Sequence, residues 1–155
     1  MLLPFVHGID APALSCALAF AQERDASLLL VSLVPSRNGS KKRVVRAESI
    51  AQAYDFFELM NHKAIRAGVP IKQTHISTQQ VARSVQALAQ EMACTGILLF
   101  VRNGAGVLLE TEDVKRLIEQ PVKPIYLFRL TAPKGWFVQI SATLMHWLQS
   151  FFAVV

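Results

Sequence analysis

Short apolar runs alternate with amphipathic segments along most of the chain. The apolar runs have the length of strands that are buried on both faces. They cover residues 2–9, 27–35, 69–77, 96–106 and 124–130. The segments between them carry apolar residues at helical spacing and cover residues 12–24, 46–67, 79–93 and 110–119. Because strands that alternate with helices are typical of βαβ units, we predict a three-layer, doubly wound α/β domain with five mainly parallel strands.

Proline, glycine and hydroxyl residues mark the ends of several predicted helices. Pro12 stands near the start of the first helix, and Gly68 follows the second helix as its stop. Ser77 or Thr78 is the expected cap of the third helix. The polar stretch 36–45 is the most loop-like part of the chain.

The end of the chain is an apolar segment without Lys, Arg, Asp or Glu, residues 136–155. As a helix it would measure about 30 Å, which is enough to span a bilayer. Six of its twenty residues are polar, and four of these share one helix face: Gln139, Thr143, His146 and Ser150. The wider opposite face carries Phe137, Ile140, Leu144, Trp147, Leu148 and Phe151. We therefore divide the chain into an α/β domain, residues 1–130, and a linker with an apolar C-terminal helix, residues 131–155.

Three interpretations of this C-terminal helix stay open. It packs on its own domain or on a partner protomer, since an apolar stripe most often marks protein contact. Alternatively it associates with a membrane, which Trp136, Trp147 and the flanking Lys134 favour. The third interpretation is a docking helix for another protein, such as a transporter.

Composition and charge fit a single domain inside the cell. The chain has 155 residues, of which 52% are hydrophobic and 17% charged. Cys16 and Cys94 have no metal-site or disulfide-framework spacing. The N-terminus lacks the basic region of a signal peptide, so we expect a cytoplasmic location, or one peripheral to the inner face of the membrane if the tail binds lipid.

The net charge of +5 does not indicate nucleic acid binding. Five basic residues lie in one short polar stretch, without interleaved aromatic residues on which bases would stack: Arg37, Lys41, Lys42, Arg43 and Arg46. We interpret this stretch as a solvated surface loop and expect no nucleic acid partner.

The candidate binding residues follow the first and fourth strands, where doubly wound sheets bind their ligands. Asp10 is placed to accept hydrogen bonds from a base or ribose, or to cap the first helix. Arg102 is placed to pair with a phosphate, and Gly104 and Gly106 either let backbone amides approach an anion or form a tight turn. The dinucleotide motif GxGxxG and the Walker motif GxxxxGK[ST] are both absent.

The remaining titratable residues do not form a catalytic motif. His7, His62, His75 and His146 are scattered along the chain. His7 falls inside the first predicted strand and His75 inside the third, which favours structural roles. Both cysteines are interpreted as packing residues. We expect no catalytic residues, no metal site and no resident cofactor.

Over residues 2–130 the chain resembles the universal stress protein family. The resemblance rests on GIDAPALSCALAFA after the first strand, LLVSLVP, AIRAGVP, GILLFVRNGAG and the closing PVKPIYLF. It implies a sheet in the order 3-2-1-4-5 and a stress-response or regulatory module that acts by binding and not by catalysis. It also implies a homodimer that forms at the edge of the last strand, where Tyr126 and Phe128 lie.

The chain departs from the phosphate-binding pattern of that family, G-x2-G-x9-G-[ST]. Val101 stands at the first glycine position and Gly104 at the second, while Thr111 and Glu112 replace Gly-[ST]. Acidic residues follow that loop, so the resemblance implies weak or absent ATP binding. What carries over is Asp10, facing adenine or ribose, the backbone of Leu33, facing the base, and Gly104.

Two alternative functions follow. The first is an ATP- or AMP-binding switch, or a slow ATPase, that uses Asp10, Arg102 and Gly104. The second is a membrane-associated regulatory subunit of a transporter that attaches through residues 136–155.

Overall fold

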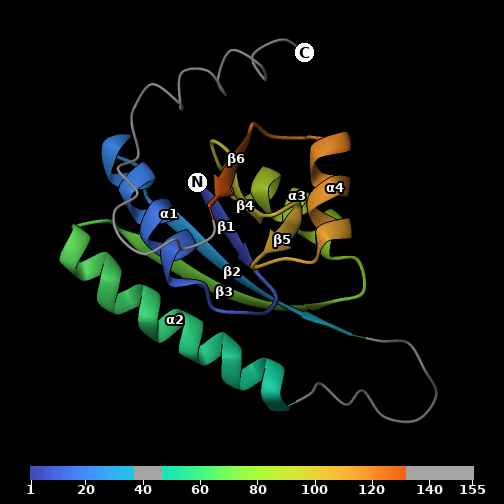
Figure 1. Ribbon diagram of the computed structural model, residues 1–155, viewed down its shortest axis with the longest axis horizontal. Helices are drawn as coiled ribbons and strands as arrows, with labels where there is room; N and C mark the ends of the chain where they lie inside the picture. The colour runs from blue at the N-terminus through green and yellow to red at the C-terminus, as the bar shows by residue number, and fades with distance from the viewer. Residues whose placement is uncertain (37–46, 132–155) are drawn as a thin grey trace.

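A computed structural model describes residues 1–36 and 47–131 of the chain (Figure 1). Its elements are β1 (Leu2–Phe5), α1 (Ala11–Glu23), β2 (Leu28–Pro35), α2 (Ala47–Ala67), β3 (Ile71–Thr78), α3 (Val81–Glu91), β4 (Ile97–Arg102), β5 (Ala105–Val107), α4 (Thr111–Glu119) and β6 (Ile125–Leu130). The basic stretch from Arg37 to Arg46 and the predicted C-terminal helix lie outside the described residues. Within the described ranges, no helix is both long enough and apolar enough to cross a membrane.

The strands form one sheet in the order β3-β2-β1-β4, and β6 lies beyond β4. These strands pair in parallel, as shown by the registers Leu2↔Leu29 for β1 with β2 and Ile97↔Ile125 for β4 with β6. The predicted order is therefore confirmed, with β6 as the predicted fifth strand. A further short strand, β5, was not predicted; it pairs with β4 in the antiparallel direction.

Helices cover both faces of the sheet, α1 and α2 on one side and α3 and α4 on the other (Figure 1). Alternation along β2 supplies both cores: Leu28 and Leu30 pack on the α1 side, and Leu29, Val31 and Leu33 on the α3 side. Burial on both faces explains why the central strands are almost continuously apolar. The rings of Phe5 and Phe56 stack in the α1-side core with centroids 4.2 Å apart.

The helix ends follow the sequence signals in part. Gly68 adopts a φ of +66° directly after α2, so its predicted role as a stop is confirmed. The expected Ser77 or Thr78 cap of α3 is wrong, because that helix starts later and its N-cap is Gln80, whose side chain makes no capping bond. Thr78 Oγ1 instead accepts the Gln80 N–H at 3.0 Å and lies 2.7 Å from Ser84 Oγ.

The first strand is shorter than predicted, since β1 ends at Phe5. Gly8 turns the chain with a φ of +69°. The prediction that His7 lies inside the first strand is therefore wrong. The prediction that His75 lies inside the third strand is confirmed, and its side chain is exposed on β3, an edge strand among the described residues.

The fourth strand runs into a glycine-containing turn, as the sequence predicts. It ends at Arg102, and a two-residue turn leads directly into β5. Asn103 and Gly104 both have positive φ, +53° and +81°, the pattern of the tight hairpin turns that match strand twist. Registers from Phe100↔Val107 to Arg102↔Ala105 fix the hairpin.

Substitution of Gly106 tests the packing of this hairpin. A Cβ atom there would lie 2.5 Å from the carbonyl oxygen of Leu109, so backbone would have to move. We expect Gly106→Ala to lower the free energy of unfolding by about 1–3 kcal/mol in urea denaturation. Gly104→Asn is the control, because that site is open and asparagine tolerates left-handed backbone. Equal stability of the two variants would contradict close packing at Gly106.

Candidate functional site

The sheet order reverses between β1 and β4, and the crevice at this point is where doubly wound folds bind ligands. β1 and β4 pair only at Leu2↔Ile97. Because β6 lies along the whole of one edge of β4, β5 must use the other edge, the one that faces β1. The hairpin that β4 forms with β5 therefore occupies the space between the carboxyl ends of β1 and β4.

Backbone hydrogen bonds join the end of this hairpin to the chain that follows β1. The carbonyl oxygen of Leu108 accepts the N–H groups of Val6 at 2.7 Å and His7 at 3.4 Å. Leu108 has a φ of +70°, a strained conformation for leucine that costs about 1–2 kcal/mol. Its side chain is buried, so packing and these two bonds hold the crevice closed.

Asp10 and Arg102 come together at this edge of the sheet. Asp10 precedes α1, and its Oδ1 accepts the Ala13 N–H at 2.9 Å, so its predicted role as a helix cap is confirmed. Its Oδ2 accepts a hydrogen bond from Arg102 Nη1 at 2.5 Å, and the side chains are only 13% and 27% exposed. Each carboxylate oxygen of Asp10 thus already bonds the protein. The Nε atom of Arg102 is buried and has no hydrogen-bond partner among the described residues.

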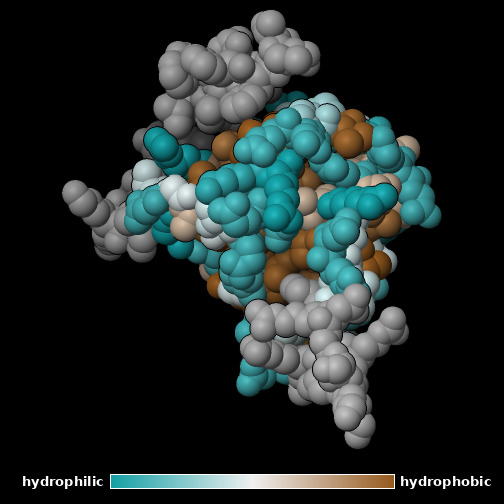
Figure 2. Space-filling view, turned by 90° about the vertical axis from the view of Figure 1, so that its right-hand side faces the viewer, coloured by the Kyte–Doolittle hydropathy of each residue, from teal (hydrophilic) through white to brown (hydrophobic). Residues whose placement is uncertain are grey.

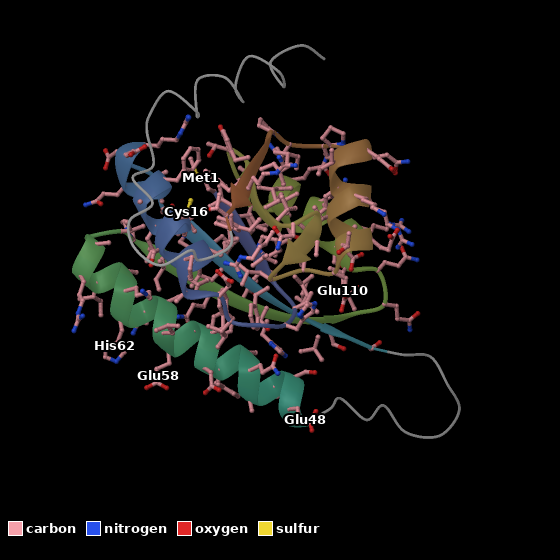
Figure 3. All side chains as sticks on the ribbon, viewed as in Figure 1. Met1, Cys16, Glu48, Glu58, His62 and Glu110 are labelled. Carbon is pink, nitrogen blue, oxygen red and sulfur yellow. The ribbon has the colours of Figure 1, made fainter. Side chains whose placement is uncertain are left out.

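A second pair of polar side chains lies beside the hairpin. The Nε2 atom of His7 is 3.0 Å from Oε1 of Glu110, although the two do not have hydrogen-bond geometry. Glu110 lies at the start of α4 next to β5 (Figure 3). Glu110 is one of the acidic residues that follow the loop after the fourth strand, and nothing in the local sequence indicated its closeness to His7.

The predicted glycine sites serve the hairpin itself. Gly104 forms its turn, and Gly106 donates its N–H to Thr111 Oγ1 at 3.0 Å. Leu33 is fully buried in β2 and paired in register with Ile76 of β3. Only its backbone remains for contact with a ligand, as the resemblance implies.

The start of α4 is acidic. Glu110 precedes this helix, and Glu112 and Asp113 lie in its first turn. Carboxylates at this end of a helix interact favourably with the helix dipole. A hydrogen bond and the charge of Lys115 lower the pKa of Glu112, while burial raises the pKa of Asp113. Viewed from the α4 side, hydrophilic side chains surround smaller areas of apolar surface (Figure 2). This helix start therefore carries a cluster of carboxylates.

The two thiols are poor nucleophiles. Burial, helped by the charge of Glu23, raises the pKa of Cys16 to about 11, and its sulfur packs between α1 and the sheet (Figure 3). Burial also raises the pKa of Cys94, against the opposing charges of the N-terminus and Lys123. Within the described part of the chain, no three His, Cys, Asp or Glu side chains gather as a metal site requires.

Two open hollows lie elsewhere on the surface and were not predicted. One, of about 520 Å³, opens at the amino end of the sheet beside Met1, Asp25 and Cys94. The other, of about 580 Å³, lies at the start of α3 beside Thr78, Arg83 and Ser84. None of the predicted ligand residues lines either hollow.

No protein-family model and no curated protein matches the sequence. Solved structures match the fold. A universal stress protein family protein from Burkholderia pseudomallei has a TM-score of 0.63 and 16% identity, covering 82% of this chain and 94% of that chain. The universal stress protein from Archaeoglobus fulgidus in complex with dAMP has a TM-score of 0.62 and 16% identity, covering 81% of this chain and 94% of that chain. A universal stress protein family protein from Arabidopsis thaliana with AMP bound has a TM-score of 0.58 and 14% identity, covering 86% of this chain and 94% of that chain.

These likenesses agree with the resemblance seen in the sequence. The structural neighbours are universal stress proteins. Because the identities are so low, the likeness shows the α/β fold of this chain and nothing beyond the fold. Two of them carry a bound adenine nucleotide, dAMP or AMP. The alignments cover nearly all of each neighbour but leave part of this chain without a counterpart.

A double-mutant cycle tests the link between Asp10 and Arg102. Asp10→Ala removes the α1 cap and is expected to cost about 0.5–2 kcal/mol for that reason alone. With Arg102→Ala in the same cycle, urea denaturation should give a coupling energy of about 0.5–3 kcal/mol. The control pair is Glu112 and Lys115, which is exposed and should show no measurable coupling. Additive effects at positions 10 and 102 would contradict the contact.

Proposed function

We propose that this chain is a universal-stress-protein-like regulatory module that acts by binding and dimerisation, without catalysis and with weak or absent ATP binding. The observation that carries the proposal is the β4–β5 hairpin between the carboxyl ends of β1 and β4. In this fold that space is the ligand crevice. Here the chain's own backbone occupies it.

Two energetic terms oppose a triphosphate at this place. A ligand that used Asp10 would have to displace Arg102, and a hydrogen bond between charged groups contributes about 1.5–3 kcal/mol. Phosphates near the start of α4 would meet Glu110, Glu112 and Asp113, and one like-charge pair at about 4 Å costs about 1–4 kcal/mol. Both terms act against ATP more than against a neutral ligand.

A nucleotide switch is the second candidate. It is favoured by the position of Asp10 and Arg102 at the carboxyl edge of the sheet and by the bound dAMP and AMP of two structural neighbours. Opening of the Asp10–Arg102 pair would be the switching step. Because AMP has one phosphate, the acidic start of α4 would repel it less than ATP.

The proposed location is the cytoplasm, and the proposed partner is a second copy of the chain. β6 pairs with β4 along one edge, and along this strand Tyr126 and Phe128 are only half-buried. An unpaired strand edge is a template for another strand. Attachment of the module to a membrane or a transporter through residues 136–155 is the remaining alternative.

Calorimetry tests the weak binding of ATP. Titration of the full-length protein with ATP and magnesium should give no dissociation constant below about 100 µM, because the crevice is closed and its rim is acidic. A low-micromolar constant would overturn the proposal. A weak heat of ATP binding that comes from this crevice should be abolished by Asp10→Asn. Asp25→Asn, at the opposite end of the sheet, is the control and should leave that heat unchanged.

Mass spectrometry separates the two candidates. Denaturation of the purified protein should release no nucleotide in stoichiometric amount. Release of stoichiometric AMP or ATP would favour the switch.

Hydrogen exchange tests the dimer. With rising protein concentration, amides of β6 should become more protected as its free edge pairs with a second copy. β3 is the matched control, because it is the other edge strand of the sheet and should exchange at an unchanged rate. Sedimentation should give twice the chain mass of 17.2 kDa over the same range. Protection of β3 instead, or a monomer at every concentration, would count against this dimer.

A further inference from the structure

The α1-side face of β6 is less well covered than the rest of that face. Tyr126, Phe128 and Leu130 alternate along β6 and pack against the α1-side core, yet none is fully buried. On the neighbouring strand β4, the side chains Leu98 and Phe100 of the same face are each 1% exposed. The cover of this face therefore thins out between β4 and β6.

The described helices explain this difference. From α1, Phe20 reaches β6, with ring centroids 4.9 Å from Tyr126 and 5.1 Å from Phe128. Arg24 lies over the rings of Phe20 and Tyr126 at 4.4 and 5.2 Å. α2 lies beyond α1, towards β3, and α3 and α4 cover the opposite face (Figure 1). These four helices thus leave Tyr126, Phe128 and Leu130 of β6 only partly buried.

The chain continues directly from this strand. We propose that residues 136–155 of the same chain pack as a helix on the α1-side face of β6, next to α1. The linker from residue 131 to residue 135 includes Pro133 and Gly135, and a connection of this length suits a reversal of direction. The helix would measure about 30 Å, against about 20 Å for a six-residue strand, so it covers β6 along its whole length.

The segment and the face complement each other chemically. The wide apolar side of the segment, with Phe137, Leu144 and Phe151 among its residues, matches the row of Tyr126, Phe128 and Leu130. Its polar stripe then faces water. A helix that spans a bilayer would turn this stripe of four polar side chains to lipid, which is unfavourable.

Tryptophan fluorescence of the full-length protein tests this contact. The chain has two tryptophans, Trp136 and Trp147, and both belong to the segment. Without lipid, their emission should be blue-shifted, weakly quenched by acrylamide, and unchanged on dilution. Phe128→Asp should shift the emission to the red and raise the quenching constant several-fold. Arg129→Asp is the control, since Arg129 is exposed on the other face of β6 and should have no effect.

A milder variant covers the case in which Phe128→Asp unfolds the domain. Leu130→Gln, at the last position of β6, keeps the size of the side chain and should also raise quenching, with circular dichroism reporting an intact fold. Water-exposed emission that turns blue only with phosphatidylcholine–phosphatidylglycerol vesicles would overturn the proposal in favour of lipid. A blue shift lost on dilution, together with the dimer mass, would overturn it in favour of a second copy. A blue shift that neither β6 variant alters would place the segment on another surface.

Discussion

The divergence of β1 and β4 beyond their single pair, Leu2↔Ile97, is the constraint on which the carboxyl edge of this protein depends. Two parallel strands that separate leave N–H and C=O groups unpaired, and such groups must find partners if they are to be buried. Here β5 pairs with β4, and Leu108 accepts the N–H groups of Val6 and His7. The turns at Gly8 and Asn103–Gly104 follow from this requirement, because both bring chain into the gap.

The position of the β4–β5 hairpin between β1 and β4 bears on what this edge of the sheet can bind. The hairpin places backbone in the crevice, and Asp10 and Arg102 at its rim are already bonded to each other. The acidic start of α4 adds an electrostatic barrier on the same side. The fold is therefore that of nucleotide-binding neighbours, while the crevice is arranged for self-contact, which shifts the expected function towards association.

Much of the fold could be predicted from the sequence because it depends on local patterns. The nearly continuous apolar run of 28–33 indicates a buried strand, and the helical spacing of apolar residues in 47–67 indicates a helix. The three residues of β5 are too few for any periodicity. Their signal was the Asn103–Gly104 pair, which is typical of hairpin turns, but the two glycines of NGAG also fit an anion-binding loop.

The site was predictable only in part. Asp10 and Arg102 were each singled out, but their contact joins distant parts of the chain, and nothing in the local sequence indicates it. The same limit applies to β6, which reads as a buried strand although it stands at the edge of the sheet. Exposure of an apolar strand depends on its position in the sheet, and strand composition does not encode that position.

The hairpin also bears on the order in which the chain folds. Its turn joins neighbouring residues and can form early, whereas the contact of Leu108 with Val6 joins the segment before α4 to the chain that follows β1, and such long loops close slowly. Docking of the hairpin is thus a late event that depends on a completed sheet. Until it happens, two unpaired strand edges face each other in the nascent protein, and this gap is where a chaperone or a second chain would find its target.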